Sequence, residues 1–375
     1  MLIGIPRETR PGETRVAATP ETVKKLVASG KHEAIVESGA GTASSIPDAA
    51  YEAAGARIAE TRDALGAELV LKVRAPFGDE LAGLARSATV VGLLDPFDTA
   101  GMAALANTGV TGFALERLPR ITRAQSMDVL SSQANIAGYK AVLVAAFHYG
   151  RFMPMLMTAA GTVKAARVLV LGVGVAGLQA IATAKRLGAV IEASDVRPSV
   201  KDQVESLGGK WVDVPYETDE EREIAEGAGG YARPMPAAWM QRQAAIIAER
   251  CRTMDIVITT ALIPGRPAPK LVRADTVAAM KPGAVIVDLA VEQGGNVEGS
   301  EAGQIVERNG VTIVGLTNLP ALVAADASAL YARNVLNFVA LSLNLKSGEY
   351  AIPRDDEIVQ ATLVCENGQV VVRDQ

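Results

Sequence analysis

The 375-residue sequence is poor in the residues that build disulfide frameworks and metal clusters. It has two cysteines, Cys251 and Cys365, and two histidines, His32 and His148, which are too few for either kind of structure. We therefore expect no disulfide framework, no metal site and a protein of a reducing compartment. Aromatic residues make up only 4% of the chain, so Val, Ile, Leu and Ala must supply the core.

The sequence also lacks an excess of positive charge. The net charge is -5, with 37 basic and 42 acidic residues and no long block of one sign, which argues against a nucleic-acid binder. No signal peptide is visible at the start, MLIGIPRE. The uncharged run Val168–Ala184 is shorter than the roughly 20 residues of a spanning helix and contains three glycines. We therefore expect no direct membrane insertion.

Short apolar runs alternate with helical stretches along the chain, whose length suits two or three domains. This alternation predicts an α/β fold of two doubly wound parallel-sheet (Rossmann-like) domains separated by a cleft. We expect the first domain to comprise residues 1–130 and 325–375, and the second residues 131–324. The expected strands are Leu2–Pro6, Ala34–Glu37, Leu69–Val73, Thr89–Leu94, Thr111–Leu115, Arg167–Leu171, Val190–Ser194, Ile256–Thr259, Ala284–Leu289 and Thr312–Gly315.

Four longer stretches have the pattern of helices or of a functional loop. The expected helices are Pro20–Ser29, Ser131–Phe147, with Ser131 or Ser132 as its N-cap, and Ala325–Lys346, which returns the chain to the first domain. The segment Thr218–Gln243 is acidic and then rich in glycine and proline, so we expect it to be disordered or to form a lid. The end of the chain, Thr362–Arg373, is expected to form a hairpin around Asn367-Gly368.

A glycine-rich segment, Gly172-Val-Gly174-Val-Ala-Gly177, has the spacing of a dinucleotide-binding loop. It lies between an expected strand and an expected helix, and Asp195 ends the next strand. The glycines allow a tight turn, the approach of a pyrophosphate and close helix packing, whereas the helix N-terminus attracts phosphate. Asp195 predicts NAD(H) over NADP(H), although the neighbouring Arg197 is suited to a 2′-phosphate. The expected cofactor-binding residues are Gly172, Gly174, Val175, Ala176, Gly177, Asp195, Val196 and Arg197.

Three further loops follow expected strands and should lie at the same edge of the second sheet. They add Thr260, Ala261, Leu262, Glu292 and Asn318 to the expected cofactor-binding residues. An asparagine at such a place can bond to a carboxamide or a ribose. Asn318 is equally compatible with a simple turn before Pro320.

Three segments resemble the NAD(H)-binding domain of proton-translocating nicotinamide nucleotide transhydrogenase. They are the stretch from Arg120 to Gly138 (RITRAQSMDVLSSQANIAG), Met157–Thr162 and Gly172–Ala180. The opening segments Gly4–Glu8 and Glu13–Ala17 are similar to the superfamily that includes alanine dehydrogenase. This resemblance covers nearly the whole chain and implies hydride transfer between NADH and NADP(H) held by a partner subunit.

The resemblance implies roles for several residues near a bound nicotinamide. It places Arg120, Gln125, Asp128 and Ser131 on a loop beside the ring and Tyr231 on a mobile loop that closes over the nucleotide. Gln125 is the residue we expect to bond to the nicotinamide ribose, with an Arg120–Asp128 pair holding the loop. Asp128 or Ser131 could instead only cap the following helix.

The resemblance also implies partners. These are a second copy of the chain, in a homodimer, an NADP(H)-binding subunit and membrane-spanning subunits that move the proton. It implies a peripheral, cytoplasmic position on the inner membrane.

A soluble alanine dehydrogenase is the alternative function, and a nucleotide-sensing module without catalysis is a third. Arg15 and Lys72 match substrate positions of the dehydrogenase, but its histidine is replaced by Leu94-Asp95-Pro96 and an aspartate by Glu292. The missing acid–base group favours the transhydrogenase.

Overall fold

The computed structural model describes residues 1–226, 235–263 and 265–371. It divides into two compact units, unit 1 (residues 1–133 and 320–375) and unit 2 (residues 134–319). Each unit is built around its own sheet. Within the described residues, no helix is long and apolar enough to cross a membrane.

The sheet of unit 2 has the strand order of a dinucleotide-binding fold. The order is β11-β10-β9-β12-β13-β15-β14, so that the parallel strands counted along the chain run 3-2-1-4-5-6, and only the edge strand β14 is antiparallel. The order reverses between β9 and β12, which is where ligands bind in such sheets. The strands are β9 Arg167–Leu171, β10 Val190–Ser194, β11 Lys210–Trp211, β12 Ile256–Thr259, β13 Val285–Asp288, β14 Ile305–Arg308 and β15 Val311–Val314.

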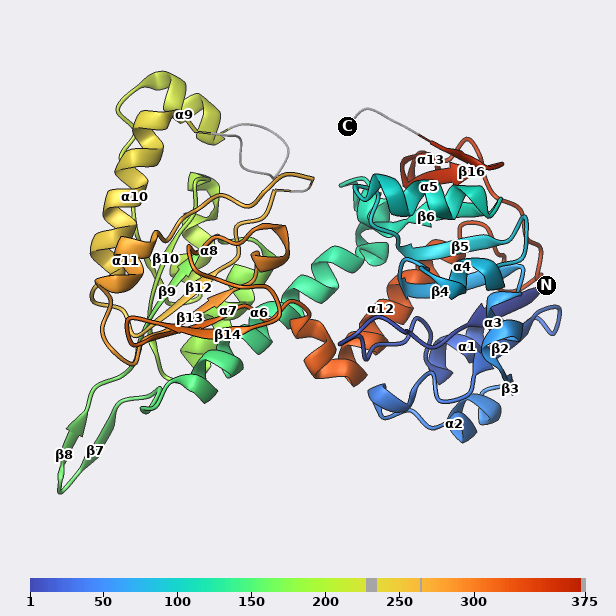
Figure 1. The fold of residues 1–375 in the computed structure, drawn as a ribbon, viewed down its shortest axis with the longest axis horizontal. Helices are drawn as coiled ribbons and strands as arrows, with labels where there is room; N and C mark the ends of the chain where they lie inside the picture. Colours follow the sequence, from blue (N-terminus) through green and yellow to red (C-terminus); the bar gives the residue numbers. More distant parts are fainter. Residues whose placement is uncertain (227–234, 264, 372–375) are drawn as a thin grey trace. The chain divides into compact units, whose positions relative to one another are not determined.

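Alternate residues of these strands bury opposite faces of the sheet. In β9, Val168 and Val170 pack with α6 (Val129–His148), α7 (Val175–Arg186) and α8 (Lys201–Ser206). Leu169 and Leu171 instead pack toward α10 (Ala237–Cys251) and α11 (Ala274–Ala278). Figure 1 shows these two sets of helices on the two sides of the sheet. A hairpin of β7 (Leu156–Thr158) and β8 (Gly161–Val163) projects away from the rest of unit 2 (Figure 1).

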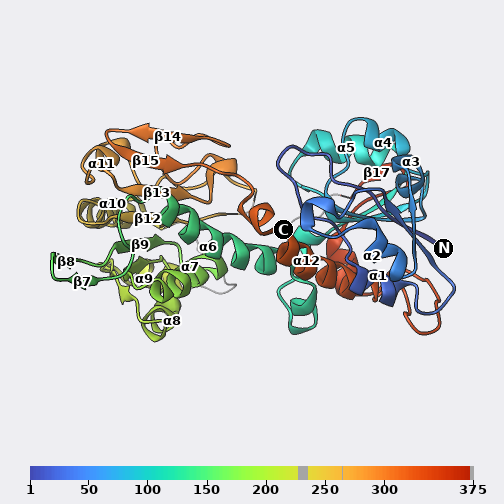
Figure 2. The same cartoon turned by 90° about the horizontal axis from the view of Figure 1, so that it is seen from below.

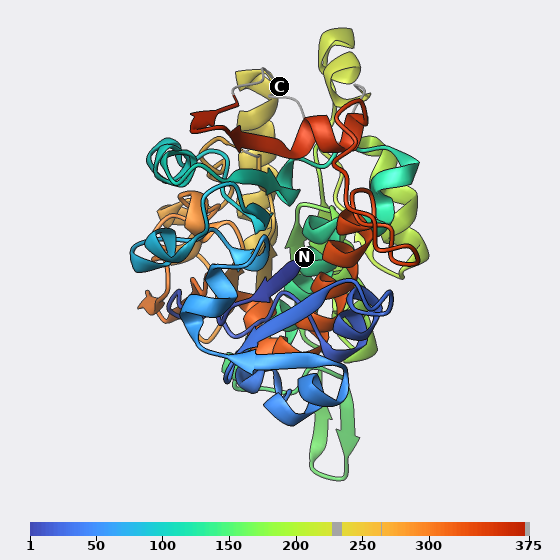
Figure 3. The same cartoon turned by 90° about the vertical axis from the view of Figure 1, so that its right-hand side faces the viewer.

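The sheet of unit 1 has the same winding. Its order is β17-β16-β6-β5-β4-β1-β2-β3, so β1 to β6 also run 3-2-1-4-5-6, and the antiparallel strands β16 and β17 extend one edge. Figure 3 shows the C-terminal strand β16, in red, beside β6 at one end of this sheet. The strands are β1 Leu2–Ile5, β2 Glu33–Glu37, β3 Ala56–Ala59, β4 Leu69–Arg74, β5 Thr89–Leu93, β6 Thr111–Ala114, β16 Leu363–Glu366 and β17 Gln369–Val370.

Helices cover both faces of the unit 1 sheet (Figure 2). One core cluster joins the sheet to α1, α2, α12 and α13, and the other joins it to α3, α4 and α5. The C-terminal segment of the chain therefore completes unit 1 with two helices on one face and two strands at the edge. The helices are α1 Pro20–Leu26, α2 Asp48–Ala53, α3 Thr61–Leu65, α4 Asp79–Gly83, α5 Thr99–Asn107, α12 Ala324–Val339 and α13 Glu357–Thr362.

All the strands expected from the sequence are confirmed, each to within one residue at either end. The helices differ more. The helix expected over Ala325–Lys346 ends at Val339, and the chain then turns at Asn344, whose side chain accepts two backbone N–H groups. The described residues of Thr218–Gln243 are not disordered, because they include α9 (Asp219–Glu226) and the start of α10. The lid role that we considered for this segment stays a prediction.

Candidate functional site

The Gly172–Gly177 loop follows β9 at the reversal point of the unit 2 sheet. Gly172 has φ +95°, and a Cβ atom there would lie 2.6 Å from the Thr260 hydroxyl oxygen. A Cβ atom on Gly177 would lie 2.0 Å from the carbonyl oxygen of Gly172. Both positions therefore require glycine, one for its backbone conformation and one for the close approach of α7 to the loop.

Gly174 lies in a different environment. It has φ -81°, which any residue adopts, and nothing lies within 4 Å of a Cβ atom built there. The N-terminus of α7 begins at the next residue, Val175, which is 40% exposed, and Ala176 follows. Open space beside unpaired helix N–H groups suits a pyrophosphate. Gly138 of α6, which the sequence did not single out, lets that helix approach, since its Cβ atom would lie 2.0 Å from the Ala176 oxygen.

Asp195 connects the Gly172–Gly177 loop to the end of β10. Its Oδ2 accepts the backbone N–H of Val173 at 2.7 Å. The guanidinium of Arg197 donates to Oδ1 at 2.9 Å and to Oδ2 at 3.0 Å. The Val196 carbonyl between them accepts the hydroxyl of Tyr216 at 3.2 Å. The acidic side chain is thus held at the place where a ribose would lie, with an arginine beside it.

The Thr260–Leu262 loop lies against the glycine loop and is held by a residue that the sequence did not predict. Thr260 donates its hydroxyl to the Gly172 carbonyl at 2.9 Å. The fully buried Asn296 accepts the N–H of Ala261 at 3.0 Å and donates to the Ala261 carbonyl at 2.9 Å. Asp288 in turn accepts the N–H of Asn296. The Gly294-Gly295 turn before Asn296 was the available signal in the sequence.

The other expected nucleotide residues of unit 2 are more peripheral. Leu262 is 42% exposed, Glu292 is exposed in a short 3-10 turn, and Asn318 is half-buried just after β15. Tyr231 lies outside the described residues. Further along the chain, Trp239 of α10 stacks on Tyr216 with ring centroids 6.2 Å apart. Helix α10 is therefore linked through Tyr216 to Val196.

Gln125 lies in unit 1 on a short 3-10 helix, η3 (Thr122–Met127). Its neighbours Ala124 and Met127 are buried in the unit 1 core, whereas Gln125 itself is exposed. Among the described residues, no group bonds to the Gln125 amide. Arg120, also exposed, precedes η3. The turn therefore presents one amide side chain to the outside from a firmly packed base.

Asp128 is the N-cap of α6, so our expectation that Ser131 or Ser132 caps this helix is wrong. One oxygen of Asp128 accepts the backbone N–H of Ser131 at 2.9 Å, and the other accepts its hydroxyl at 2.5 Å. This bonding satisfies an N–H group of the first helical turn, and α6 begins at Val129. The capping role that we considered for Asp128 is thus present, and the Arg120–Asp128 pair stays a prediction.

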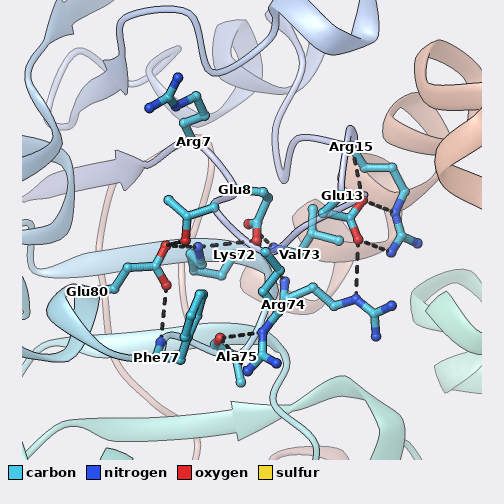
Figure 4. A network of polar contacts seen from close by, with 12 residues as sticks. Arg7, Glu8, Glu13, Arg15, Lys72, Val73, Arg74, Ala75, Phe77 and Glu80 are labelled. Carbon is cyan, nitrogen blue, oxygen red and sulfur yellow. Dashed lines mark hydrogen bonds and ion pairs between the residues drawn. The ribbon is translucent and has the colours of Figure 1, made fainter. Parts of the chain in front are cut away.

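A buried cluster of charged residues fills the reversal point of the unit 1 sheet (Figure 4). Arg15 forms a two-point pair with Glu13, at 2.7 and 2.6 Å. Lys72 lies 2.8 Å from Glu80 and 3.2 Å from Glu8. Burial alone would raise the pKa of Glu13, but the hydrogen bonds and charge of Arg15 lower it to about 2. Arg15 and Lys72 are therefore neutralised by carboxylates of the chain itself.

The Glu116 side chain reaches from the end of β6 to the end of β5, where the sequence has Leu94-Asp95-Pro96. Its carboxylate accepts the N–H of Leu94 at 3.1 Å and that of Asp95 at 2.8 Å. Burial raises the pKa of Glu116 to about 7, although these backbone N–H groups oppose the shift. Of the two histidines, His32 precedes β2 at its opposite end and His148 ends α6. This region of the site therefore carries a carboxyl group rather than an imidazole.

The raised pKa of Glu116 makes the stability of the chain depend on pH. Between pH 4.5 and about 7 the Glu116 carboxyl group is protonated in the folded state and ionised in the unfolded state. The contribution to stability is complete below pH 4.5 and is lost as the pH rises through about 7. Each pKa unit is worth about 1.36 kcal/mol of unfolding free energy, and we reduce the sum because Glu116 is only half-buried. We therefore expect the protonation of Glu116 to contribute about 2 kcal/mol to the free energy of unfolding. Glu116→Gln lacks this dependence.

Urea unfolding of the wild type and of Glu116→Gln, followed by circular dichroism from pH 4 to 8, measures the effect. The difference between the two free energies of unfolding should change by about 2 kcal/mol across this range. A difference that stays constant with pH would show that Glu116 titrates normally.

Two family models match the chain. They are "Alanine dehydrogenase/PNT, N-terminal domain" over residues 4–137 and "Alanine dehydrogenase/PNT, C-terminal domain" over residues 141–373. An NAD(P) transhydrogenase alpha-subunit chain of Rhodospirillum rubrum is 52% identical over 99% of this chain and 98% of its own length. The crystal structure of transhydrogenase from Sinorhizobium meliloti superimposes with a TM-score of 0.88 at 50% identity, covering 99% of this chain and 100% of that one.

Alanine dehydrogenase is a more distant relative. The enzyme of Mycolicibacterium smegmatis is 34% identical over 80% of this chain and 75% of its own length. Identity is therefore higher, and coverage more complete, with the transhydrogenase subunits. The chain belongs to the alanine dehydrogenase/PNT family, and within it to the group of transhydrogenase alpha subunits.

Proposed function

We propose that the chain is the NAD(H)-binding subunit of a proton-translocating transhydrogenase. Hydride would pass between NADH on this chain and NADP+ on a partner subunit, and membrane subunits would move the proton. The observation that carries the proposal is the glycine loop at the reversal point of the unit 2 sheet, with Asp195 held against it through the Val173 N–H.

The residues of this site fit a dinucleotide. The open space at Gly174 and the N-terminus of α7 would receive the pyrophosphate, and Asp195 would accept the adenosine ribose hydroxyls. The residues proposed to hold NAD(H) are Gly172, Gly174, Val175, Ala176, Gly177, Asp195, Val196, Arg197, Tyr231, Thr260, Ala261, Leu262, Glu292 and Asn318. Bound NADH supplies the hydride from its nicotinamide ring.

Direct hydride transfer between two nicotinamides asks for positioning rather than for an acid or a base. This requirement suits an exposed amide on a rigid turn, which is the arrangement of Gln125. We propose that Gln125 positions the nucleotide and that Arg120, Asp128 and Ser131 belong to the same loop. Asp128 would do so by fixing the start of α6 through Ser131.

An amino-acid dehydrogenase is the less favoured function. Its chemistry moves protons during imine formation and hydrolysis and would use a group that titrates near neutrality. Glu116 titrates there, but both of its oxygens accept backbone N–H groups, and Arg15 and Lys72 are paired internally. We expect the pure chain to form no NADH from NAD+ and L-alanine, and to transfer hydride only when an NADP(H)-binding partner is added. Turnover of alanine by the chain alone would refute the proposal.

A homodimer, docked peripherally on the cytoplasmic face of the membrane subunits, completes the proposal. The β7–β8 hairpin supports it, because the hairpin and the segment before it expose large apolar side chains. Phe152 is 56% exposed, Met155 61% and Met157 71%. Sedimentation equilibrium should give twice the mass of the chain. Deleting residues 155–163 should give the single mass, and a deletion that leaves the mass unchanged would remove the hairpin from the interface.

The Asp195–Arg197 pair predicts a change of nucleotide preference. In Asp195→Asn the negative charge that repels a 2′-phosphate is lost, and Arg197 is released from its two-point pair. We expect NADH affinity to fall about 10-fold and the preference for NADH over NADPH to fall about 100-fold. Calorimetric titration with both nucleotides checks this. A preference that does not change would mean that Asp195 lies away from the ribose.

A further inference from the structure

The turn that carries Gln125 is held by an unusual double hydrogen bond. The backbone carbonyl of Ser126, the next residue, accepts the side-chain amide of Asn334 at 2.8 Å and that of Asn337 at 2.9 Å. The two asparagines are one turn apart on α12 and come from the far end of the chain, completing unit 1. A carbonyl oxygen has two lone pairs, so these two donors occupy both of them.

The oxygen end of the Asn334 amide is bonded to a third residue. Ser132, in the first turn of α6, donates its hydroxyl to the Asn334 Oδ1 at 2.7 Å. Because the Ser126 carbonyl can only accept, the nitrogen end of the amide faces Ser126, and its oxygen end accepts the Ser132 hydroxyl. Ser132 also accepts the amide of Gln133 at 3.3 Å, and Gln133 accepts the guanidinium of Arg15 at 2.8 Å. A chain of hydrogen bonds thus connects the buried charged cluster to this turn.

These contacts fix the orientation of the peptide next to Gln125. Ala124 and Met127 are buried on either side of it, and the two amides prevent the Ser126 carbonyl from rotating. The backbone from which the Gln125 side chain projects is therefore fixed although the side chain itself is exposed. Preorganisation of this kind is what a residue that positions a reactant requires.

We propose that Asn334 and Asn337 are positioning residues that orient Gln125 by holding the Ser126 carbonyl. This inference rests on the proposed function, in which Gln125 positions the nucleotide for hydride transfer. The asparagines act through the turn and touch no reacting atom. The amide nitrogens of the two asparagines hold the Ser126 carbonyl, so the donor groups of these side chains matter and their size does not.

Replacement by aspartate separates an effect of the donor nitrogens from an effect of side-chain size. Asn334→Asp and Asn337→Asp keep the shape of each side chain but turn the donor nitrogen into an oxygen that repels the Ser126 carbonyl. Asn107→Asp, at the exposed end of α5, is the matched control. The double variant Asn334→Asp/Asn337→Asp is to be measured in the wild-type chain and in a Gln125→Ala chain, each assembled with its partner subunits.

We expect the double variant to lower the hydride-transfer rate about 10- to 100-fold, with NADH affinity within about twofold of wild type. In the Gln125→Ala chain it should have almost no further effect, since the residue that it orients is absent. Amide hydrogen exchange of the free chain should become faster over residues 122–128. The Asn107→Asp control should change none of these quantities.

Three results would overturn the inference. They are a double variant that keeps the wild-type transfer rate, an equal loss with and without Gln125, and unchanged hydrogen exchange over residues 122–128. If the wild-type assembly transfers no hydride at all, the proposed function fails. The exchange measurement then still decides whether the two asparagines hold the turn.

Discussion

Replacing Gly174 by valine should lower the affinity for NADH at least about 100-fold while leaving the chain as stable as the wild type. The backbone of Gly174 already has an extended conformation, and a Cβ atom there meets nothing within 4 Å. Valine therefore fits the free chain. Its methyl groups would, however, fill the space that a pyrophosphate needs beside the first N–H groups of α7.

Gly177 provides the contrast within the same loop. A Cβ atom on Gly177 would lie 2.0 Å from the Gly172 oxygen, so Gly177→Ala must displace α7 from β9 and destabilise the fold. Gly150→Ala, with nothing near its Cβ atom, is the control for both variants. Thermal unfolding and NADH titration should separate Gly174→Val, which loses only binding, from Gly177→Ala, which loses both. Normal NADH binding by Gly174→Val would place the nucleotide elsewhere.

Gln125→Asn should slow hydride transfer about 100-fold in the assembled enzyme, with little change in stability. The change shortens an exposed side chain by one methylene group and keeps its amide. The turn beneath it stays anchored by Ala124, Met127 and the two bonds to the Ser126 carbonyl. An amide withdrawn by about 1.5 Å can no longer hold its partner group at the distance that transfer requires.

The control for this variant is Gln203→Asn, an exposed glutamine on α8. Pre-steady-state measurement of transfer in the presence of the partner subunits isolates the chemical step from product release. We expect Gln203→Asn to transfer at the wild-type rate. An unchanged rate in Gln125→Asn would remove Gln125 from the mechanism.

The sequence predicted the strands well because their signals are local. Buried parallel strands such as Arg167–Leu171 and Ile256–Thr259 are runs of Val, Ile and Leu almost without interruption, bounded by glycine or by polar residues. Helix ends were less predictable. Asp128 rather than Ser131 or Ser132 caps α6, because three side chains near one helix start could all do so and only packing selects one.

The features of the site that could not be predicted depend on distant residues. Asn296 holds Ala261 from 35 positions away, and Asn334 reaches Ser126 from 208 positions away. Neither contact has a sequence period or a motif of its own. The pairing of Arg15 with Glu13 lies within one short segment, but its burial depends on the whole of unit 1. Motifs thus indicated the residues that would meet the nucleotide, and the fold revealed the residues that hold them.

Hydride transfer from NADH to an NADP analogue tests the proposed function most directly. The wild-type chain should be assayed alone and with the NADP(H)-binding and membrane-spanning partner subunits, and Gly174→Val should serve as the binding-deficient control. We predict no transfer by the chain alone, transfer on addition of the partners, and none with Gly174→Val. Absence of transfer in the complete assembly, or NADH formation from L-alanine by the chain alone, would contradict the proposed function.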